Sequence, residues 1–176
     1  MSPPPPQRLS HEGNLVGALT LALADRMEEA TSQAAGGSGE LAAALSSLHM
    51  FLESPSIKLL KEVLGLTPSG AVRLVDRLER AGLAERSAAS DARGRQVTLT
   101  RRGRTAARAV VTARRAVLEP ALASLTDGER ARLDALLAKV LAGLKRKPGA
   151  ERWTCRLCDT AACGRDEGNC PFVGAD

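Results

Sequence analysis

Aromatic residues are nearly absent from this chain of 176 residues, which has no tyrosine, two phenylalanines and one tryptophan, so that aromatics make up 2% of it. A hydrophobic core must therefore be aliphatic. Alanine, leucine and arginine head the ranking of helix propensities, and the composition accordingly favours helices. The sequence also lacks an apolar run of about 18 residues, so we expect no membrane-spanning helix and no membrane partner.

Histidine is scarce as well. The two histidines, His11 and His49, stand far apart in the sequence, and each is more typical of a surface or packing residue than of a ligand. No motif supports a Ser-His-Asp set, and the GGSG stretch at 36–39 has no lysine of a phosphate-binding loop. These absences argue against an enzyme.

Cysteine is absent from residues 1–154, and all four cysteines stand in CRLCDTAACGRDEGNC, residues 155–170. The start of the chain, MSPPPPQRLS, has no apolar segment of a signal peptide; its proline run predicts a disordered leader at 1–12. We therefore expect a cytoplasmic protein. In that reducing compartment, clustered cysteines are more often metal ligands or reactive thiols than structural disulfides.

The charge of the chain is one-sided. The formal net charge is +5 and the isoelectric point is near 9.4, which suits a polyanionic partner. Between residues 86 and 115 there are nine arginines and a single acid, Asp91. A merely solvated surface usually mixes both signs, so this stretch favours binding to the backbone of a DNA duplex.

Hydrophobic periodicity and turn residues predict a mainly α fold with a minor β hairpin. The expected helices are 13–32, 40–52, a short one that ends at 64, 68–80, 102–124 and 126–144, and the expected strands are 83–86 and 95–100. Thr67 followed by Pro68 is a typical helix start, and Thr126 with Glu129 forms a capping box. Pro120 should kink or shorten its helix.

The segment SIKLLKEVLGLTPSGAVRLVDRLERAGL, residues 56–83, has the helix, glycine turn and helix of a helix-turn-helix. On a helical wheel the second helix has an aliphatic face, made of Ala71, Leu74, Val75 and Leu78. The opposite face is small or basic and carries Ser69, Gly70, Arg73, Arg77 and Arg80. Such a helix can enter a major groove, with its N-terminus on a phosphate and its arginines on guanine or phosphate. The alternative is that these arginines only form a solvated face.

The stretch LTPSGAVRLVDRLERAGLAERSAASDARGRQVTLTRRG resembles the core of the MarR family of dimeric winged helix-turn-helix transcription factors. The motifs that carry the resemblance are the leucine-rich helix and turn from Arg73 to Leu83, the D-x-R at Asp91 and Arg93, and the LT..G at Leu99, Thr100 and Gly103. The resemblance covers residues 13–144, with the DNA-binding core at 38–103.

The resemblance implies a role for particular residues. Those that would face the major groove are Ser69, Gly70, Arg73 and Arg77. Arg93 at the wing tip would enter the minor groove with its orientation held by Asp91, and Arg95 follows it in the wing. The first helix and the last two would form a homodimer interface, which places two recognition helices about one DNA turn apart on a near-palindromic operator.

The cysteine spacing, C-x2-C-x4-C-x6-C, predicts a metal site in a tail at 145–176. Four thiolates complete a tetrahedral structural zinc site, and a C-x2-C pair commonly supplies two of them. The expected ligands are Cys155, Cys158, Cys163 and Cys170. Pro171 after the last cysteine also resembles the C-P ending of some iron–sulfur runs, although the spacing matches neither ferredoxin pattern. Zinc, an iron–sulfur cluster and a thiol switch without metal all remain open.

These features together predict a sequence-specific DNA-binding regulator of transcription that acts as a homodimer, in most cases as a repressor, with a structural or sensory metal site. A small-molecule effector is a further expected partner. The alternative is a zinc-stabilised protein-interaction module whose basic helices bind an acidic protein. Salt dependence separates the two, because binding to duplex DNA weakens steeply as the logarithm of salt concentration rises.

Overall fold

The computed structural model describes residues 9–87, 95–144, 151–165 and 167–172, with only the backbone at 151 and 152. In chain order the elements are α1 (His11–Ala35), α2 (Gly39–Met50), α3 (Ile57–Leu64), α4 (Pro68–Arg80), β1 (Ala84–Ser87), β2 (Gln96–Leu99), α5 (Arg101–Ala121), α6 (Asp127–Gly143), α7 (Glu151–Thr154), the 3-10 turn η1 (Cys155–Leu157) and α8 (Thr160–Cys163). The predicted mainly helical fold with one hairpin is confirmed. The linker at 145–150 and most of the leader lie outside the described residues.

Local capping sets the starts of the longer helices. In each of six helices a serine or threonine oxygen at the N-cap accepts a hydrogen bond from the backbone amide three residues later, at Ser10, Ser38, Ser56, Thr67, Thr100 and Thr126. The predicted Thr67 cap and the capping box of Thr126 with Glu129 are confirmed. The cap at Ser10 starts α1 at His11, two residues before the predicted helix start at residue 13.

Pro120 shortens α5, which ends before the predicted residue 124. The helix ends at Ala121, one residue after the proline. Because proline has no amide hydrogen and its ring crowds the preceding turn, the chain closes with a tighter hydrogen bond from the Leu122 amide to the Glu119 carbonyl, 3.1 Å long. The next helix, α6, therefore turns away from α5.

The core is aliphatic, as the composition predicts, and α2 lies at its centre. Residues 41–47 of α2 are all buried, and α3, α4, the hairpin and the first half of α5 pack around them. The largest fully buried apolar side chains are Leu45, Leu60, Leu74, Leu78, Val63, Val75, Val97 and Val110.

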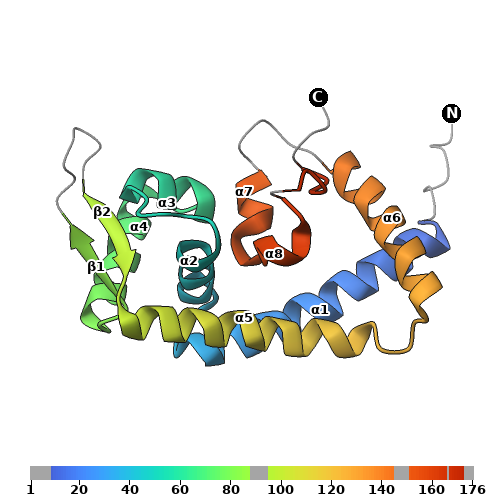
Figure 1. Ribbon diagram of the computed structural model, residues 1–176, viewed down its shortest axis with the longest axis horizontal. Coiled ribbons are helices and arrows are strands. Elements are labelled where there is room, and N and C mark those ends of the chain that lie inside the picture. Colours follow the sequence, from blue (N-terminus) through green and yellow to red (C-terminus); the bar gives the residue numbers. More distant parts are fainter. Residues whose placement is uncertain (1–8, 88–94, 145–150, 166, 173–176) are drawn as a thin grey trace, which may run out of the picture.

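Two long helices form a platform along one side of the molecule. Helices α1 and α5 pack against each other along their length, and Figure 1 shows them crossing the whole view. At one end of this platform α2, α3, α4 and the hairpin form the winged helix module, and at the other end α6 crosses the start of α1 in the view of Figure 1. The short helices α7 and α8 occupy the space between α2 and α6 (Figure 1). Within the described residues no helix has the length and apolar character needed to cross a bilayer.

Candidate nucleic-acid interface and cysteine tail

Helix α4 turns its aliphatic face entirely into the module. Ala71, Leu74, Val75 and Leu78 are all 0% exposed, as the helical wheel predicts. The helix starts at the Thr67 cap with Pro68 in its first turn and is 13 residues long. Since this face is buried over the full length of α4, the small and basic face is the one left to meet a partner.

The predicted major-groove residues lie on that outer face. Ser69, Arg73 and Arg77 are exposed, and Gly70 is half-buried. The Gly70 amide donates to the Thr67 hydroxyl, 3.1 Å away, and is therefore not free to donate to a ligand. Because Gly70 has no side chain, it would let a DNA backbone come close to α4. The DNA contacts of these four residues stay predictions.

Arg77 has an acidic partner on the neighbouring helix. Its guanidinium lies 2.8 Å from the Glu40 carboxylate at the start of α2, and the two side chains are 43% and 55% exposed. Exposed ion pairs of this kind contribute little stability, because both charges are well solvated. A phosphate could therefore compete with Glu40 for Arg77.

Arg86 has a structural role, in ion pairs with α4, that the sequence analysis did not predict. Its guanidinium is 2.6 Å from Asp76 and 2.7 Å from Glu79, both on α4, and its side chain is 17% exposed. It also donates to the Val72 carbonyl. Arg86 thus fixes the first wing strand to the recognition helix, and it is not part of the basic surface to which the count of nine arginines assigned it.

The hairpin is anchored at its base on both sides. Strand β1 pairs with β2 in antiparallel register from Ala84↔Leu99 to Ser87↔Gln96. The Val97 amide donates to the Pro55 carbonyl at 3.0 Å, which ties β2 to the segment before α3. Asp91 and Arg93 lie outside the described residues, and Arg95, just before β2, is exposed.

The cysteine tail, by which we mean the described residues of 151–172, docks on the winged helix module. The Ser47 hydroxyl of α2 donates to the Arg156 carbonyl at 3.0 Å, and the Thr160 hydroxyl donates to the Met50 carbonyl at 3.2 Å. The Trp153 ring lies on the backbone of Gly65, where an added Cβ would be 3.1 Å from two ring atoms. Trp153, the tryptophan of the tail, thus packs against the body of the protein at the end of α3.

The internal turns of the tail follow its sequence. Asp159 caps α8 by accepting hydrogen bonds from two backbone amides. Gly164 and Gly168 both have positive φ, at 59° and 77°, which glycine adopts without strain. These turns return the chain so that Cys170 is buried like Cys155.

The four thiols gather as two interacting pairs. A hydrogen bond with Cys155, aided by the charges of Arg114 and Arg156, lowers the pKa of Cys158 to about 6 against the opposing effect of burial. The same hydrogen bond raises the pKa of Cys155. Burial raises the pKa of Cys163, which also interacts with Cys170 and Cys158.

Among the described residues no group of three or more His, Cys, Asp or Glu side chains has the geometry to hold a metal ion. The structure therefore does not bring the four predicted cysteine ligands into one coordination shell. The donor chemistry fits a thiophilic metal, since four cysteines without a competing histidine match the structural zinc sites and the iron–sulfur clusters that thiolates hold. The metal stays a prediction.

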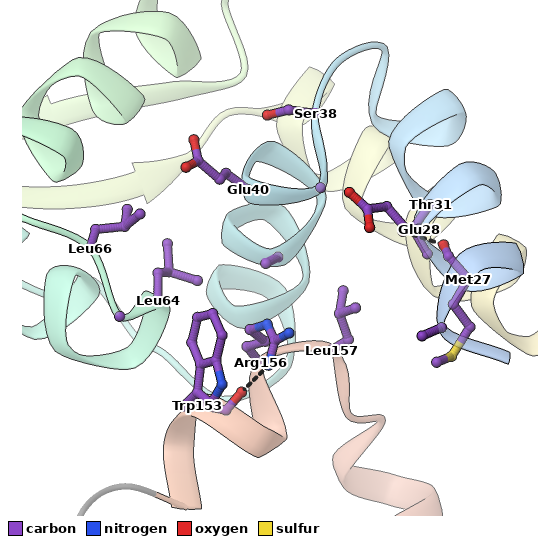
Figure 2. Close-up of a pocket in the computed structure, with 14 residues that line it drawn as sticks. Met27, Glu28, Thr31, Ser38, Glu40, Leu64, Leu66, Trp153, Arg156 and Leu157 are labelled. Carbon is purple, nitrogen blue, oxygen red and sulfur yellow. Dashed lines mark hydrogen bonds between the residues drawn. The ribbon is translucent and has the colours of Figure 1, made fainter. Parts of the chain in front are cut away.

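A pocket of about 650 Å³ lies between α1, α2, the turn after α3 and the tail. Figure 2 shows Trp153 and Leu157 of the tail on one side of it, Leu64 and Leu66 on another, and Met27 and Glu28 of α1 opposite. Its volume falls in the range of small-molecule sites. The sequence gave no signal for this pocket, because its walls come from α1 and α2, the turn after α3, and the tail, which are separated by long stretches of chain.

Comparison of the sequence with protein-family models finds no match, and neither does comparison with curated proteins. Solved structures do match. MepR, a transcription regulator of the Staphylococcus aureus multidrug efflux pump MepA, superposes with a TM-score of 0.65 at 17% identity, over 78% of this chain and 100% of its own. A MarR-family transcriptional regulator from Silicibacter pomeroyi gives 0.62 at 24% identity, over 81% and 99%.

A mutant of S. aureus MepR bound to an oligodeoxyribonucleotide is also similar, with a TM-score of 0.57 at 19% identity over 78% of this chain and 100% of its own. The neighbours span nearly their whole length on this chain, so the likeness extends from the platform helices to the wing. The chain therefore has the winged helix-turn-helix fold of the MarR-family transcription regulators.

Proposed function

We propose that this protein is a homodimeric, sequence-specific DNA-binding regulator that represses transcription by occupying a promoter. The observation that carries the proposal is the division of α4 into a fully buried aliphatic face and an outer face that presents Ser69, Arg73 and Arg77. The similar MepR mutant, bound to an oligodeoxyribonucleotide, supports the same use of this fold here.

Helix α4 would act by entering the major groove. Arg73 has the planar fork of donors that binds O6 and N7 of guanine, and it stands in the first half of the helix, where recognition residues contact base edges. The wing residues Arg93 and Arg95 would hold the adjacent backbone and minor groove, oriented by Asp91. Arg77 would exchange the Glu40 carboxylate for DNA, and the exposure of that ion pair makes the exchange inexpensive.

Dimerisation would supply the second recognition helix. On α1 the side chains of Leu15, Val16 and Leu19 are more than half exposed, and on α6 Leu136 and Val140 are exposed to 60% and 50%. Apolar surface of this extent on two helices at the same end of the molecule (Figure 1) is typical of an interaction site. A second copy of the chain would bury it.

A gel shift with Arg73→Ala tests the groove assignment. The probe is a duplex that the wild-type full chain selects from a random-sequence DNA pool. Loss of an arginine that reads a guanine should cost about 1–3 kcal/mol and relax selectivity at one base pair. The matched control is Lys139→Ala, which removes an exposed cation of α6 remote from α4. Equal affinity of wild type and Arg73→Ala would refute the assignment.

We also propose that Cys155, Cys158, Cys163 and Cys170 hold one metal, zinc in the first place and an iron–sulfur cluster as the alternative. The spacing and the two interacting thiol pairs support it. Metal analysis of anaerobically purified protein decides between them. Colourless protein with one zinc per chain supports zinc, and brown protein with visible absorbance supports the cluster. Protein that holds neither would refute the metal site and leave a tail of free thiols.

The pocket of about 650 Å³ is where a small-molecule effector would fit.

A further inference from the structure

The cysteine tail contacts the winged helix module at the element that positions α4. Gly65 ends α3 in the left-handed conformation, with φ of 61°, and two residues later Thr67 caps α4. This is the turn of the helix-turn-helix. The Trp153 ring lies directly on the Gly65 backbone, so the tail supports the turn that sets the angle between α3 and α4.

A second set of contacts joins the tail to α2. The carbonyl of Arg156 accepts from Ser47, and Thr160 donates to the carbonyl of Met50. Leu157 packs on the hydrophobic core of the module. The tail thus covers both the C-terminal half of α2 and the end of α3. It is held there by these two hydrogen bonds and by the apolar packing of Leu157.

Helix α2 links the tail to the platform, because α2 packs on both α1 and α5. The tail therefore joins the turn after α3 to the helix of the module that rests on the platform. Between the tail and α1 lies the pocket of about 650 Å³, and Figure 2 shows Trp153 and Leu157 of the tail in one of its walls.

We infer that the cysteine tail is an internal brace that holds the helix-turn-helix at one orientation to the α1–α5 platform, and that the brace is in place only while its four cysteines are held together. This inference rests on the proposed DNA-binding function. In a dimer the orientation of each module fixes the spacing of the two recognition helices, so a brace that selects one orientation lowers the ordering cost of binding DNA. Releasing the brace should weaken binding.

The dependence on cysteine follows from the size of the tail. Its helices α7 and α8 have four residues each and η1 has three, far below the length at which helices persist without support. Small units of this kind need disulfides or a metal to stay folded. The burial of Cys155 and Cys170 makes the cysteine cluster the centre of the tail, so its loss should unfold the tail and free Gly65.

Trp153 is the only tryptophan in the chain, and its fluorescence therefore reports docking directly. Trp153 is 43% exposed in the docked tail, so the full-length Cys155→Ser/Cys170→Ser variant should shift its emission further to the red, toward that of a fully solvated indole, and speed amide exchange at residues 62–66. Thr154→Ala, an exposed neighbour of the tryptophan, is the control and should behave as wild type. Wild-type emission and exchange in the double cysteine variant would overturn the inference.

Affinity for DNA tests the consequence of docking. With the duplex selected by the wild-type chain, Trp153→Ala should raise the Kd at least about tenfold, within the usual range of coupling between sites, and Thr154→Ala should leave it unchanged. Thr160→Val, which removes only the hydrogen bond to Met50, serves if Trp153→Ala fails to fold, and should raise the Kd by a smaller factor. Unchanged or tighter binding by the folded variants overturns the brace.

The fluorescence and DNA-binding experiments together distinguish failure of this inference from failure of the proposed function. If the wild-type chain selects no duplex, DNA binding is refuted while the fluorescence arm still tests docking. If titrating zinc alone into metal-free full-length protein leaves Trp153 emission unchanged, yet the cysteine variant shifts it, the brace stands and zinc is refuted as the group that holds it.

Discussion

Among the described glycines, Gly103 has the least room for a side chain. A Cβ built there would lie 1.8 Å from the Leu83 carbonyl oxygen and 3.1 Å from the Leu99 side chain. The same Leu83 carbonyl accepts the Thr100 amide at 3.0 Å, and the Thr100 hydroxyl donates to the Gly82 carbonyl at 2.7 Å. The start of α5 is therefore pressed onto the turn that follows α4, which explains physically why the LT..G motif ends in glycine.

Gly103→Ala should destabilise the protein by more than about 3 kcal/mol, at or beyond the upper end of overpacking effects, because the obstructing atom is backbone and cannot rotate away. Thermal or urea unfolding followed by circular dichroism measures the change. Gly128→Ala is the matched control: nothing lies within 4 Å of its added Cβ, and alanine in a helix should change stability by about 0 to 1 kcal/mol in the favourable direction. Similar stability of both variants would contradict the close approach.

Arginines illustrate what sequence could and could not supply at this scale. The helical wheel correctly placed Arg73 and Arg77 outside because the period of an α-helix is fixed. It could not tell that Arg77 meets Glu40 or that Arg86 meets Asp76 and Glu79, because those partners depend on how separate elements pack. The sequence gives the number and sign of the charges in a segment, but it does not show which side chains form ion pairs.

At the scale of elements, starts and stops were predictable where the signal is local. Thr67 with Pro68 and the Thr126 box each satisfy their own helix end, so their sequence suffices to find them. The docking of the tail has no such local signal. Its site on α2 and Gly65, and the pocket beside it, arise from segments about a hundred residues apart, and no periodicity records such contacts.

The capping box of α6 makes a prediction about pH. Hydrogen bonds from the Thr126 backbone amide, and then from its hydroxyl, lower the pKa of Glu129 below 4.5. A lowered folded-state pKa means stability that is present above the unfolded value of 4.5 and is lost as the pH falls through the folded value. Glu129→Gln should therefore be less stable than wild type near neutral pH. This difference in stability, the stability gap, should disappear as the pH falls below the folded-state pKa of Glu129.

Thermal unfolding at a series of pH values measures that gap. Because Glu129 is fully exposed, the gap should be small, and the informative quantity is its dependence on pH and not its size. Asp134→Asn, in the exposed middle of the same helix, is the control for removing a negative charge from α6. A gap between wild type and Glu129→Gln that stays constant down to strong acid would contradict the capping contact as its source.

For the whole molecule the main question is what covers the outer faces of α1 and α6. No residue of α6 is buried, and α1 buries only Thr31 and Ala35 at its far end. The exposed apolar side chains nevertheless lie together along one arc of α6, made of Leu136, Leu137, Val140 and Leu144. Burying apolar surface stabilises an assembly by about 25 cal/mol per Å², so these arcs favour association between copies of the chain.

Leu136→Asp/Val140→Asp should convert the proposed dimer to a monomer, because two carboxylates would be buried without partners in the proposed interface. Analytical ultracentrifugation measures the mass. A monomer reaches only half of a two-part site, so affinity for the selected duplex should fall by about 10² or more, the usual gain from linking two binding events. Ala135→Asp, on the opposite and exposed side of α6, adds the same charge and should leave both mass and affinity unchanged. A folded double variant that remains dimeric would place the interface elsewhere, and one that is monomeric yet binds the duplex with wild-type affinity would refute recognition by two modules at once.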